Sequence, residues 1–338
     1  MASGPPASGS EIAKPLRIVF MGTPALAAHI LKRLAEASDR GVQSAGFEIV
    51  GVVTRPDRPR GRGLKLEPSE VGAAAERRGI PALKPAKIRT AEFLAELSAL
   101  NPDLLVVAAY GRILPDPVLA AARIMPLNVH ASLLPRHRGA SPVEGAILAG
   151  DIESGVTIMR ITARMDAGPM LIARSIPLAP GETQGTLKQK LAELGAAALL
   201  EALERLRHGQ LAETPQDESL ATYTSPVSKA DAVIDWAADA ARIERMVRAY
   251  DPWPVARTRL GGEELLIWRA TLDDSALPGA ADAWSAAPST IVRMKPDVAV
   301  QCGRGRVVLA EVQAAGRKRM GAAEFLRGRR VIPGERLG

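Results

Sequence analysis

The residues best suited to chemistry lie in one short stretch, "LNVHASLLPRHRGASP", which begins at Leu127. Asn128 and His130 are two positions apart, so on a strand both side chains point to the same face. An Asn amide can stabilise a developing oxyanion, and a His can relay a proton near neutral pH. Asp166 could orient the imidazole if its turn folds over the strand end. This set suits acyl transfer to an amine, which needs no Ser or Cys nucleophile.

The same three residues also fit a purely structural interpretation. Asn128 could cap the end of a strand, and His130 could be a hydrogen-bonded residue of the core. Asp166 could be an ordinary turn residue before Gly168. The residue pattern alone leaves both interpretations open.

The composition of the chain narrows the class of protein. The chain has 338 residues, of which 47% are hydrophobic and 24% charged, as expected for a globular protein of two domains. Cys302 is the only cysteine, which excludes an internal disulfide and a cysteine-based zinc site, and we expect no metal. Residues 1–14 are rich in Pro and Ser and predict a disordered extension without a secretory signal. Because no apolar run approaches about 20 residues, we expect no transmembrane helix and no membrane partner. The single cysteine favours a reducing, cytoplasmic location.

The pattern of elements predicts an α/β fold for residues 15–206. Four apolar strands alternate with helical patterns: "LRIVFMG", "FEIVGVV", "DLLVVAA" and "RIMPLNVHA". Such an alternation indicates a mostly parallel, Rossmann-like sheet that is covered on both faces. Asn128 and His130 then lie at the carboxyl end of a strand, where such sheets bind ligands. The first turn, "MGTPALAA", lacks a dinucleotide fingerprint, and Thr23 is expected to cap the helix that follows.

Residues 207–222 are polar and turn-rich and predict a linker to a second domain at 223–338. The later segments are short and β-like, which indicates a small barrel of the OB type. Residues 304–330 contain eight basic and two acidic residues, and the formal net charge of the chain is +7. A positive stripe on this barrel could contact a nucleic-acid backbone. A second basic segment, residues 55–65, could do the same or could be a solvated surface loop.

Several motifs resemble those of enzymes that use 10-formyltetrahydrofolate as a formyl donor. "NVHASLLPRHRGASP" is similar to the signature of this family, and "YGRILP" is similar to its pterin-binding segment. The resemblance implies that Asn128, His130 and Asp166 are catalytic. It also implies a folate pocket formed by Arg112, Ile113, Leu114, Ser132, Leu133, Leu134, Pro135, Ala163, Arg164 and Met165.

Within this family, the chain is most similar to the methionyl-tRNA formyltransferases. "FMGTP", "TRPDRPRGRGLKLEPSEV", "DAGPML" and "DPWP" all resemble their pattern, which runs from about Leu16 to the end of the chain. The resemblance implies a formyltransferase domain followed by an OB-like tRNA-binding domain, in a monomer. The implied partners are folate and initiator methionyl-tRNA, whose α-amine would be formylated for translation initiation. The expected tRNA contacts are Arg58, Arg60, Arg62, Lys65, Arg304, Arg306, Arg317, Lys318 and Arg319, with Arg62 at the position of the family's key arginine.

The sequence departs from the family pattern at two places near the predicted pocket. His137 stands where a Trp or Tyr is more usual, and "VEGAIL" differs from the helix expected after "ASP". Two other functions remain open: a folate-dependent formyltransferase acting on a small-molecule amine, and a nucleic-acid-binding protein without catalysis. The basic segments argue against the first, and the intact Asn128, His130 and Asp166 argue against the second.

Overall fold

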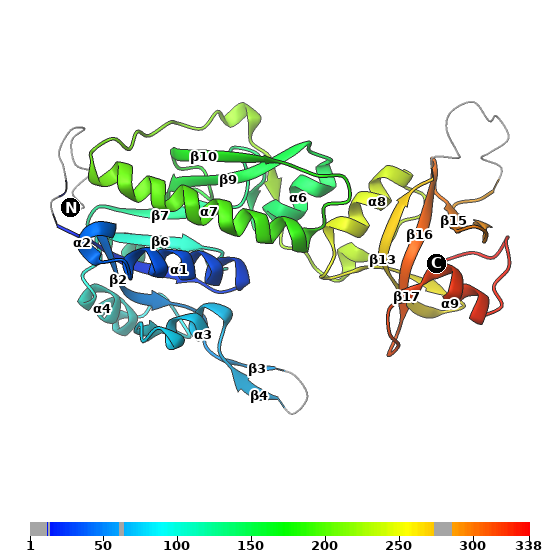
Figure 1. Cartoon of the computed structure of the whole chain (residues 1–338), viewed down its shortest axis with the longest axis horizontal. Coiled ribbons are helices and arrows are strands. Elements are labelled where there is room, and N and C mark those ends of the chain that lie inside the picture. The colour runs from blue at the N-terminus through cyan, green and yellow to red at the C-terminus, as the bar shows by residue number, and fades with distance from the viewer. Residues whose placement is uncertain (1–11, 13, 61–63, 274–285) are drawn as a thin grey trace. The chain divides into compact units, whose positions relative to one another are not determined.

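The computed structural model describes residues 12, 14–60, 64–273 and 286–338 (Figure 1). The chain divides into two compact units. The first unit comprises residues 1–142, 153–177 and 188–224, and the second comprises residues 143–152, 178–187 and 225–338.

The first unit is built around a mostly parallel sheet. Its strands are β1 (Leu16–Gly22), β2 (Phe47–Val53), β3 (Arg58–Arg60), β4 (Lys65–Glu67), β5 (Ala82–Leu83), β6 (Leu104–Ala108), β7 (Met125–His130), β8 (Arg138–Gly139), β9 (Glu153–Arg160), β10 (Met170–Pro177) and β11 (Tyr223–Thr224). Its helices are α1 (Ala25–Ser38), α2 (Val42–Ala45), α3 (Glu70–Arg77), α4 (Ala91–Ala99), α5 (Asp116–Leu119) and the short 3-10 turn η1 (Glu218–Leu220). Helix α6 (Pro142–Ala149) falls almost wholly in the second unit, and α7 (Gln184–Arg207) begins in the second unit and continues in the first.

The main sheet has seven strands in the order β10-β9-β7-β6-β1-β2-β5. Strands β5, β2, β1, β6 and β7 are parallel, whereas β9 and β10 run antiparallel to their neighbours. The predicted Rossmann-like sheet is therefore confirmed. The carboxyl ends of β6 and β7 meet at one edge, which is where the candidate site lies.

Both faces of this sheet are buried, which explains the near-continuous apolar sequence of its strands. On one face, Val19 of β1 belongs to a core cluster with Phe93 and Leu97 of α4. On the other face, α1 and α7 cover the sheet (Figure 1). Gly195 lets α7 approach β7 closely, because a Cβ there would lie 3.0 Å from a methyl group of Val129.

The predicted cap of the first helix is wrong. Pro24 occupies the N-cap position of α1, and no side chain caps this helix. The Thr23 hydroxyl instead donates a hydrogen bond to the carbonyl oxygen of Tyr110, 3.2 Å away. Thr23 therefore ties the end of β1 to the loop that follows β6.

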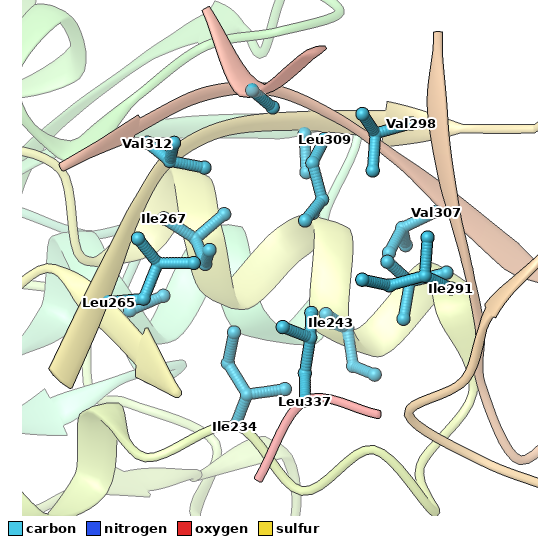
Figure 2. Close-up of a cluster of buried hydrophobic side chains, with 14 of the residues drawn as sticks. Ile234, Ile243, Leu265, Ile267, Ile291, Val298, Val307, Leu309, Val312 and Leu337 are labelled. Carbon is cyan, nitrogen blue, oxygen red and sulfur yellow. The ribbon is translucent and has the colours of Figure 1, made fainter. Parts of the chain in front are cut away.

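The second unit contains a curled antiparallel sheet in the order β12-β13-β16-β15-β14, with β17 added beside β16. Its elements are η2 (Ala230–Ala232), α8 (Ala240–Ala249), β12 (Ala256–Leu260), β13 (Glu263–Leu272), β14 (Ile291–Arg293), β15 (Val298–Gln301), β16 (Arg306–Ala314), β17 (Met320–Gly321) and α9 (Ala322–Gly328). Figure 2 shows Ile243 of α8 in the same apolar cluster as Ile267 of β13 and Leu309 of β16. The predicted OB-like second domain is confirmed.

In the part of the chain that the structure describes, every helix is too short or too polar to cross a membrane.

Candidate active site

The structure brings Asn128, His130 and Asp166 together at the carboxyl end of β7. Asn128 lies within the last residues of this strand, and His130 ends it. Asp166 comes from the loop between β9 and β10. The Asn128 Nδ2 donates to Asp166 Oδ1 at 3.3 Å, and His130 Nδ1 lies 3.7 Å from Asp166 Oδ2. The carboxylate thus faces both of the other side chains.

The backbone around Asp166 fixes the direction of its carboxylate. Asp166 itself adopts a left-handed conformation with φ of 49°, which is uncommon for a residue other than glycine. The backbone N–H of Gly139 donates to Asp166 Oδ2 at 2.9 Å. Gly168 is required for the same loop, because a Cβ there would lie 1.9 Å from the carbonyl oxygen of Arg160.

The hydrogen bonds of His130 define which of its ring nitrogens can exchange a proton. His130 is buried, and its Nε2 lies 2.9 Å from the carbonyl oxygen of His137. Because a carbonyl oxygen only accepts hydrogen bonds, Nε2 must carry the hydrogen. Nδ1 is therefore the ring nitrogen that faces the Asp166 carboxylate and is free of the contact with His137.

The predicted folate-binding residues lie on three loops, which follow β6, follow β7 and connect β9 to β10. Their side chains differ in how far they are exposed. Ile113 follows β6 and is 76% exposed, and Met165 precedes Asp166 and is 57% exposed. Leu114 instead packs against the core of the first unit, and the Nη1 of Arg112 donates to the carbonyl oxygen of Pro85. Ala163 is exposed, and Arg164 forms an ion pair with Glu218 at 2.8 Å.

The "SLLP" segment is held by its own polar contacts. The Ser132 hydroxyl donates to the carbonyl oxygen of Arg136 at 2.6 Å. Thr157 on β9 accepts from the backbone N–H of Leu134 and donates to the carbonyl oxygen of Ser132. Ser132 and Leu134 are buried, whereas Leu133 and Pro135 are partly exposed. The buried pair fixes the shape of this loop next to His130.

The basic residues expected to contact tRNA lie on two separate units. In the first unit, β3 and β4 form a hairpin on which Arg58 and Lys65 are exposed, and Arg60 pairs with Lys65 in the strand register. Arg62 lies outside the described residues.

Three of the five basic residues predicted in the second unit already have intramolecular partners. Arg304 forms an ion pair with Asp239 at 2.8 Å, and Arg306 donates to Gln301. The guanidinium of Arg319 stacks over the ring of Trp268. Arg317 and Lys318 are exposed in the turn between β16 and β17. The two turn residues are therefore the most accessible cations of this set.

Sequence reasoning missed a group of residues that surrounds Asp166. Arg138 is fully buried, and its guanidinium contacts Gln216, Glu218 and Tyr223. The hydrogen bonds from Arg138 lower the pKa of Glu218 to about 2. In turn, the hydrogen bond to Glu218 raises the pKa of Arg138 above its usual value. The only signal in the sequence was an arginine beside the candidate catalytic motif, and nothing linked it to the distant "QDES" segment.

The side chains of the candidate site are of the types that handle protons and stabilise charge. Among residues 14–60, 64–273 and 286–338, His, Cys, Asp and Glu side chains form no group of three or more that could hold a metal ion. The arrangement offers an amide donor, an imidazole and a carboxylate around one point. It can stabilise a developing oxyanion and accept a proton from an attacking amine.

Comparison with known proteins gives matches to both parts of the chain. Residues 16–203 match the formyl transferase family model, and residues 226–330 match the model of the formyl transferase C-terminal domain. A methionyl-tRNA formyltransferase from Nitrosospira multiformis is 43% identical over 323 residues, which covers 95% of this chain and 99% of the relative. One from Roseiflexus sp. is 46% identical over 324 residues, which covers 96% of each chain.

Solved structures with lower sequence identity share the fold. HypX from Aquifex aeolicus, in complex with tetrahydrofolic acid, matches 92% of this chain with a TM-score of 0.59 and 20% identity, and this chain spans about half of it (47%). An N-formyltransferase from Helicobacter canadensis, in complex with folinic acid and dTDP-3-aminofucose, matches 88% of this chain and 99% of its own, with a TM-score of 0.61 and 16% identity. With both domain models matched and relatives above 40% identity along its length, the chain belongs to the formyl transferase family.

Proposed function

We propose that this protein transfers a formyl group from 10-formyltetrahydrofolate to the α-amine of methionyl initiator tRNA. The observation that carries the proposal is the 46% identity to a methionyl-tRNA formyltransferase over 96% of both chains, which includes the second domain as well as the first. The product would be N-formylmethionyl-tRNA, which serves translation initiation.

The residues present fit a folate-derived donor. Ile113, in the loop that follows β6, and Met165, which precedes Asp166 in the sequence, both expose apolar side chains. Exposed apolar side chains at a polar site are suited to cover a flat aromatic ring system. The tetrahydrofolic acid bound by HypX, which has the same fold, supports this choice of donor.

The transfer exchanges one C–N bond for another. The amine nitrogen forms a bond to the formyl carbon, and the bond from that carbon to N10 breaks. The amine loses one proton and N10 gains one, so no external oxidant or reductant is required. The protein must therefore stabilise charge on the formyl oxygen and carry a proton from one nitrogen to the other.

In this proposal, Asn128 stabilises the developing oxyanion. Its amide has two N–H bonds, and one of them donates to Asp166. The second is left to donate to the formyl oxygen. The contact with Asp166 fixes the direction of the amide, so little reorganisation is needed during the reaction.

His130 and Asp166 handle the proton. The hydrogen on Nε2 is held by the carbonyl oxygen of His137, so His130 takes up and releases a proton at Nδ1. The Asp166 carboxylate lies 3.7 Å from Nδ1 and stabilises the imidazolium that forms. Asp166 can also order a water molecule that relays the proton toward N10.

The β3–β4 hairpin would contact the acceptor end of the tRNA. Arg58 and Lys65 are exposed on it, and so are Leu64 and Leu66. Cations on a projecting hairpin can neutralise backbone phosphates, while exposed apolar side chains can pack against unpaired bases. Arg317 and Lys318 of the second unit would add backbone contacts.

The experiment that tests the proposal is formyl transfer from 10-formyltetrahydrofolate to a panel of amines. The panel comprises methionyl initiator tRNA, uncharged initiator tRNA, free methionine, glycinamide ribonucleotide and an amino sugar nucleotide. We expect product only with the charged tRNA. Product with a small amine and none with the charged tRNA would replace this function with that of a small-molecule formyltransferase.

A further inference from the structure

The segment from Gln216 to Thr224, which we call the strap, connects the two loops that form the site. It follows α7 and carries the polar sequence "QDESLATYT". Its side chains and backbone bind the loop of Asp166 at one end and residues 137–141 at the other. None of these contacts belongs to the catalytic set described above.

Gln216 holds the loop of Asp166 through both hydrogens of its amide. Its Nε2 donates to the carbonyl oxygen of Asp166 at 2.8 Å and to that of Gly168 at 2.7 Å. One of these carbonyls belongs to Asp166, whose carboxylate faces Asn128 and His130, and the other belongs to Gly168, two residues later in the same loop. Because Asp166 has a left-handed backbone, such external bonds help to keep it in that conformation.

Arg138 fixes Gln216 in turn. The Oε1 of Gln216 accepts from Arg138 Nε at 3.1 Å and from Nη2 at 2.8 Å. The other three N–H groups of the guanidinium donate to the Glu218 carboxylate and the Tyr223 hydroxyl. All the donors of this fully buried arginine are therefore used, and the amide of Gln216 has only one orientation that satisfies them.

The other end of the strap holds the residues that position His130. The Thr222 hydroxyl accepts from the backbone N–H of His137 at 2.8 Å, and the carbonyl of His137 accepts from His130 Nε2. β11 of the strap pairs in parallel with β8. Gly139 permits this pairing, because a Cβ there would lie 2.2 Å from the carbonyl oxygen of Thr224.

We infer that Gln216 is a positioning residue for the transfer reaction and acts through the backbone of Asp166. The two hydrogen bonds that Gln216 donates hold the Asp166 carboxylate in position beside His130 and Asn128. Arg138 fixes the orientation of the Gln216 amide. This inference rests on the proposed function, because the kinetic test measures formyl transfer. It concerns a residue that does not itself touch the substrates.

The variant that isolates this role is Gln216→Glu. The Glu side chain has the same shape and still accepts hydrogen bonds from Arg138, but it cannot donate to the two carbonyls. We expect kcat to fall by about 10- to 100-fold, the range for a catalytic group that is displaced by a fraction of an ångström to about 1 Å. KM for both substrates should stay within about twofold of the wild-type values. Gln210→Glu is the matched control, because Gln210 is exposed just after the same helix, and it should leave kcat unchanged.

A double-mutant cycle with Asp166→Ala separates positioning from a general structural role. If Gln216 acts through Asp166, Gln216→Glu should lower kcat no further in the Asp166→Ala background. An equal loss in both backgrounds, or a wild-type kcat for Gln216→Glu, would overturn the inference.

Hydrogen exchange provides a readout that does not depend on the identity of the amine substrate. The Gly139 amide donates to Asp166 Oδ2, so its exchange reports whether the carboxylate is in place. In Gln216→Glu we expect peptides covering residues 136–141 to exchange faster by about tenfold. Unchanged exchange would overturn the inference, even if the wild-type protein proved to formylate a different amine.

Discussion

At the scale of single residues, hydrogen bonds fix the orientation of the side chains of the candidate site. His130 has its Nε2 fixed by the carbonyl of His137, so only Nδ1 is available for proton transfer. Asn128 uses one amide hydrogen to contact Asp166. Asp166 accepts from both Asn128 and the backbone of Gly139. The types of these residues suggest acid–base chemistry, and the role proposed for each one is based on these contacts.

Glu218 gives a pH-dependent prediction at this scale. Its pKa lies at about 2 in the folded protein because Arg138 donates hydrogen bonds to it, compared with 4.5 for an unperturbed Glu. A lowered folded-state pKa contributes stability that is fully present above pH 4.5 and is lost as the pH falls toward 2. We therefore expect Glu218→Gln to lower Tm at neutral pH, and the difference in Tm from wild type to shrink between pH 4.5 and 2.

Thermal unfolding followed by circular dichroism across this pH range checks the prediction. Glu153→Gln serves as the control, because Glu153 is exposed on β9 away from Arg138. A difference in Tm between wild type and Glu218→Gln that stays constant from pH 7 to 2 would show that the Arg138–Glu218 pair does not stabilise the fold.

At the scale of elements, the β9–β10 loop carries the catalytic Asp166 of the proposal and tolerates no side chain at Gly168. A Cβ there would lie 1.9 Å from the carbonyl oxygen of Arg160, which is backbone and cannot move aside cheaply. We expect Gly168→Ala to destabilise the protein by about 1–3 kcal/mol and to lower kcat, since the loop must shift. Urea unfolding and a formyl-transfer assay measure the two effects.

Gly328→Ala is the matched control for this substitution. Gly328 lies in α9, and a Cβ there would meet no atom within 4 Å. Ala is the better helix former, so this variant should be as stable as wild type or slightly more stable. If Gly168→Ala behaved like Gly328→Ala, the tight turn would not be what places Asp166.

The main elements were predictable from sequence because burial on both faces leaves a clear apolar signal. β1, β2, β6 and β7 all follow this pattern. β5 has only two residues and gives no such signal. The cap at Thr23 was predicted wrongly because its hydroxyl finds a long-range partner, Tyr110, in place of the helix backbone.

The candidate site was predictable in part for the same reason. Asn128 and His130 are two apart on a strand, so local periodicity places them on one face. Asp166 was a candidate partner of His130 on chemical grounds, but no local pattern brings it to β7, and its assignment to the same site came from the family resemblance. The contacts of Gln216 with Asp166 and Arg138 join residues far apart in sequence, and a polar, turn-rich composition carries no information about such pairings.

At the scale of the whole molecule, the proposed substrate is a polyanion, and the basic segments lie on both units. Formyl transfer to tRNA should therefore weaken as salt concentration rises. We expect Arg62→Ala to raise KM for tRNA and to reduce the slope of log(kcat/KM) against log[salt] by about 1, which corresponds to one lost phosphate contact.

Arg40→Ala is the control for charge alone. Arg40 is exposed just after α1, at the end of the first unit opposite the carboxyl edge of the sheet. It should leave the salt slope unchanged. An identical slope for wild type and Arg62→Ala would remove Arg62 from the tRNA contacts.

The central claim is that the cluster of Asn128, His130 and Asp166 performs formyl transfer to methionyl initiator tRNA. The most direct test is the single-turnover rate of formylation, with both substrates saturating, for wild type and Asn128→Ala. We expect N-formylmethionyl-tRNA from the wild-type protein and a rate about 10²- to 10³-fold lower for a folded Asn128→Ala protein. An equal rate for the two proteins would contradict it, because the amide of Asn128 would then not stabilise the oxyanion.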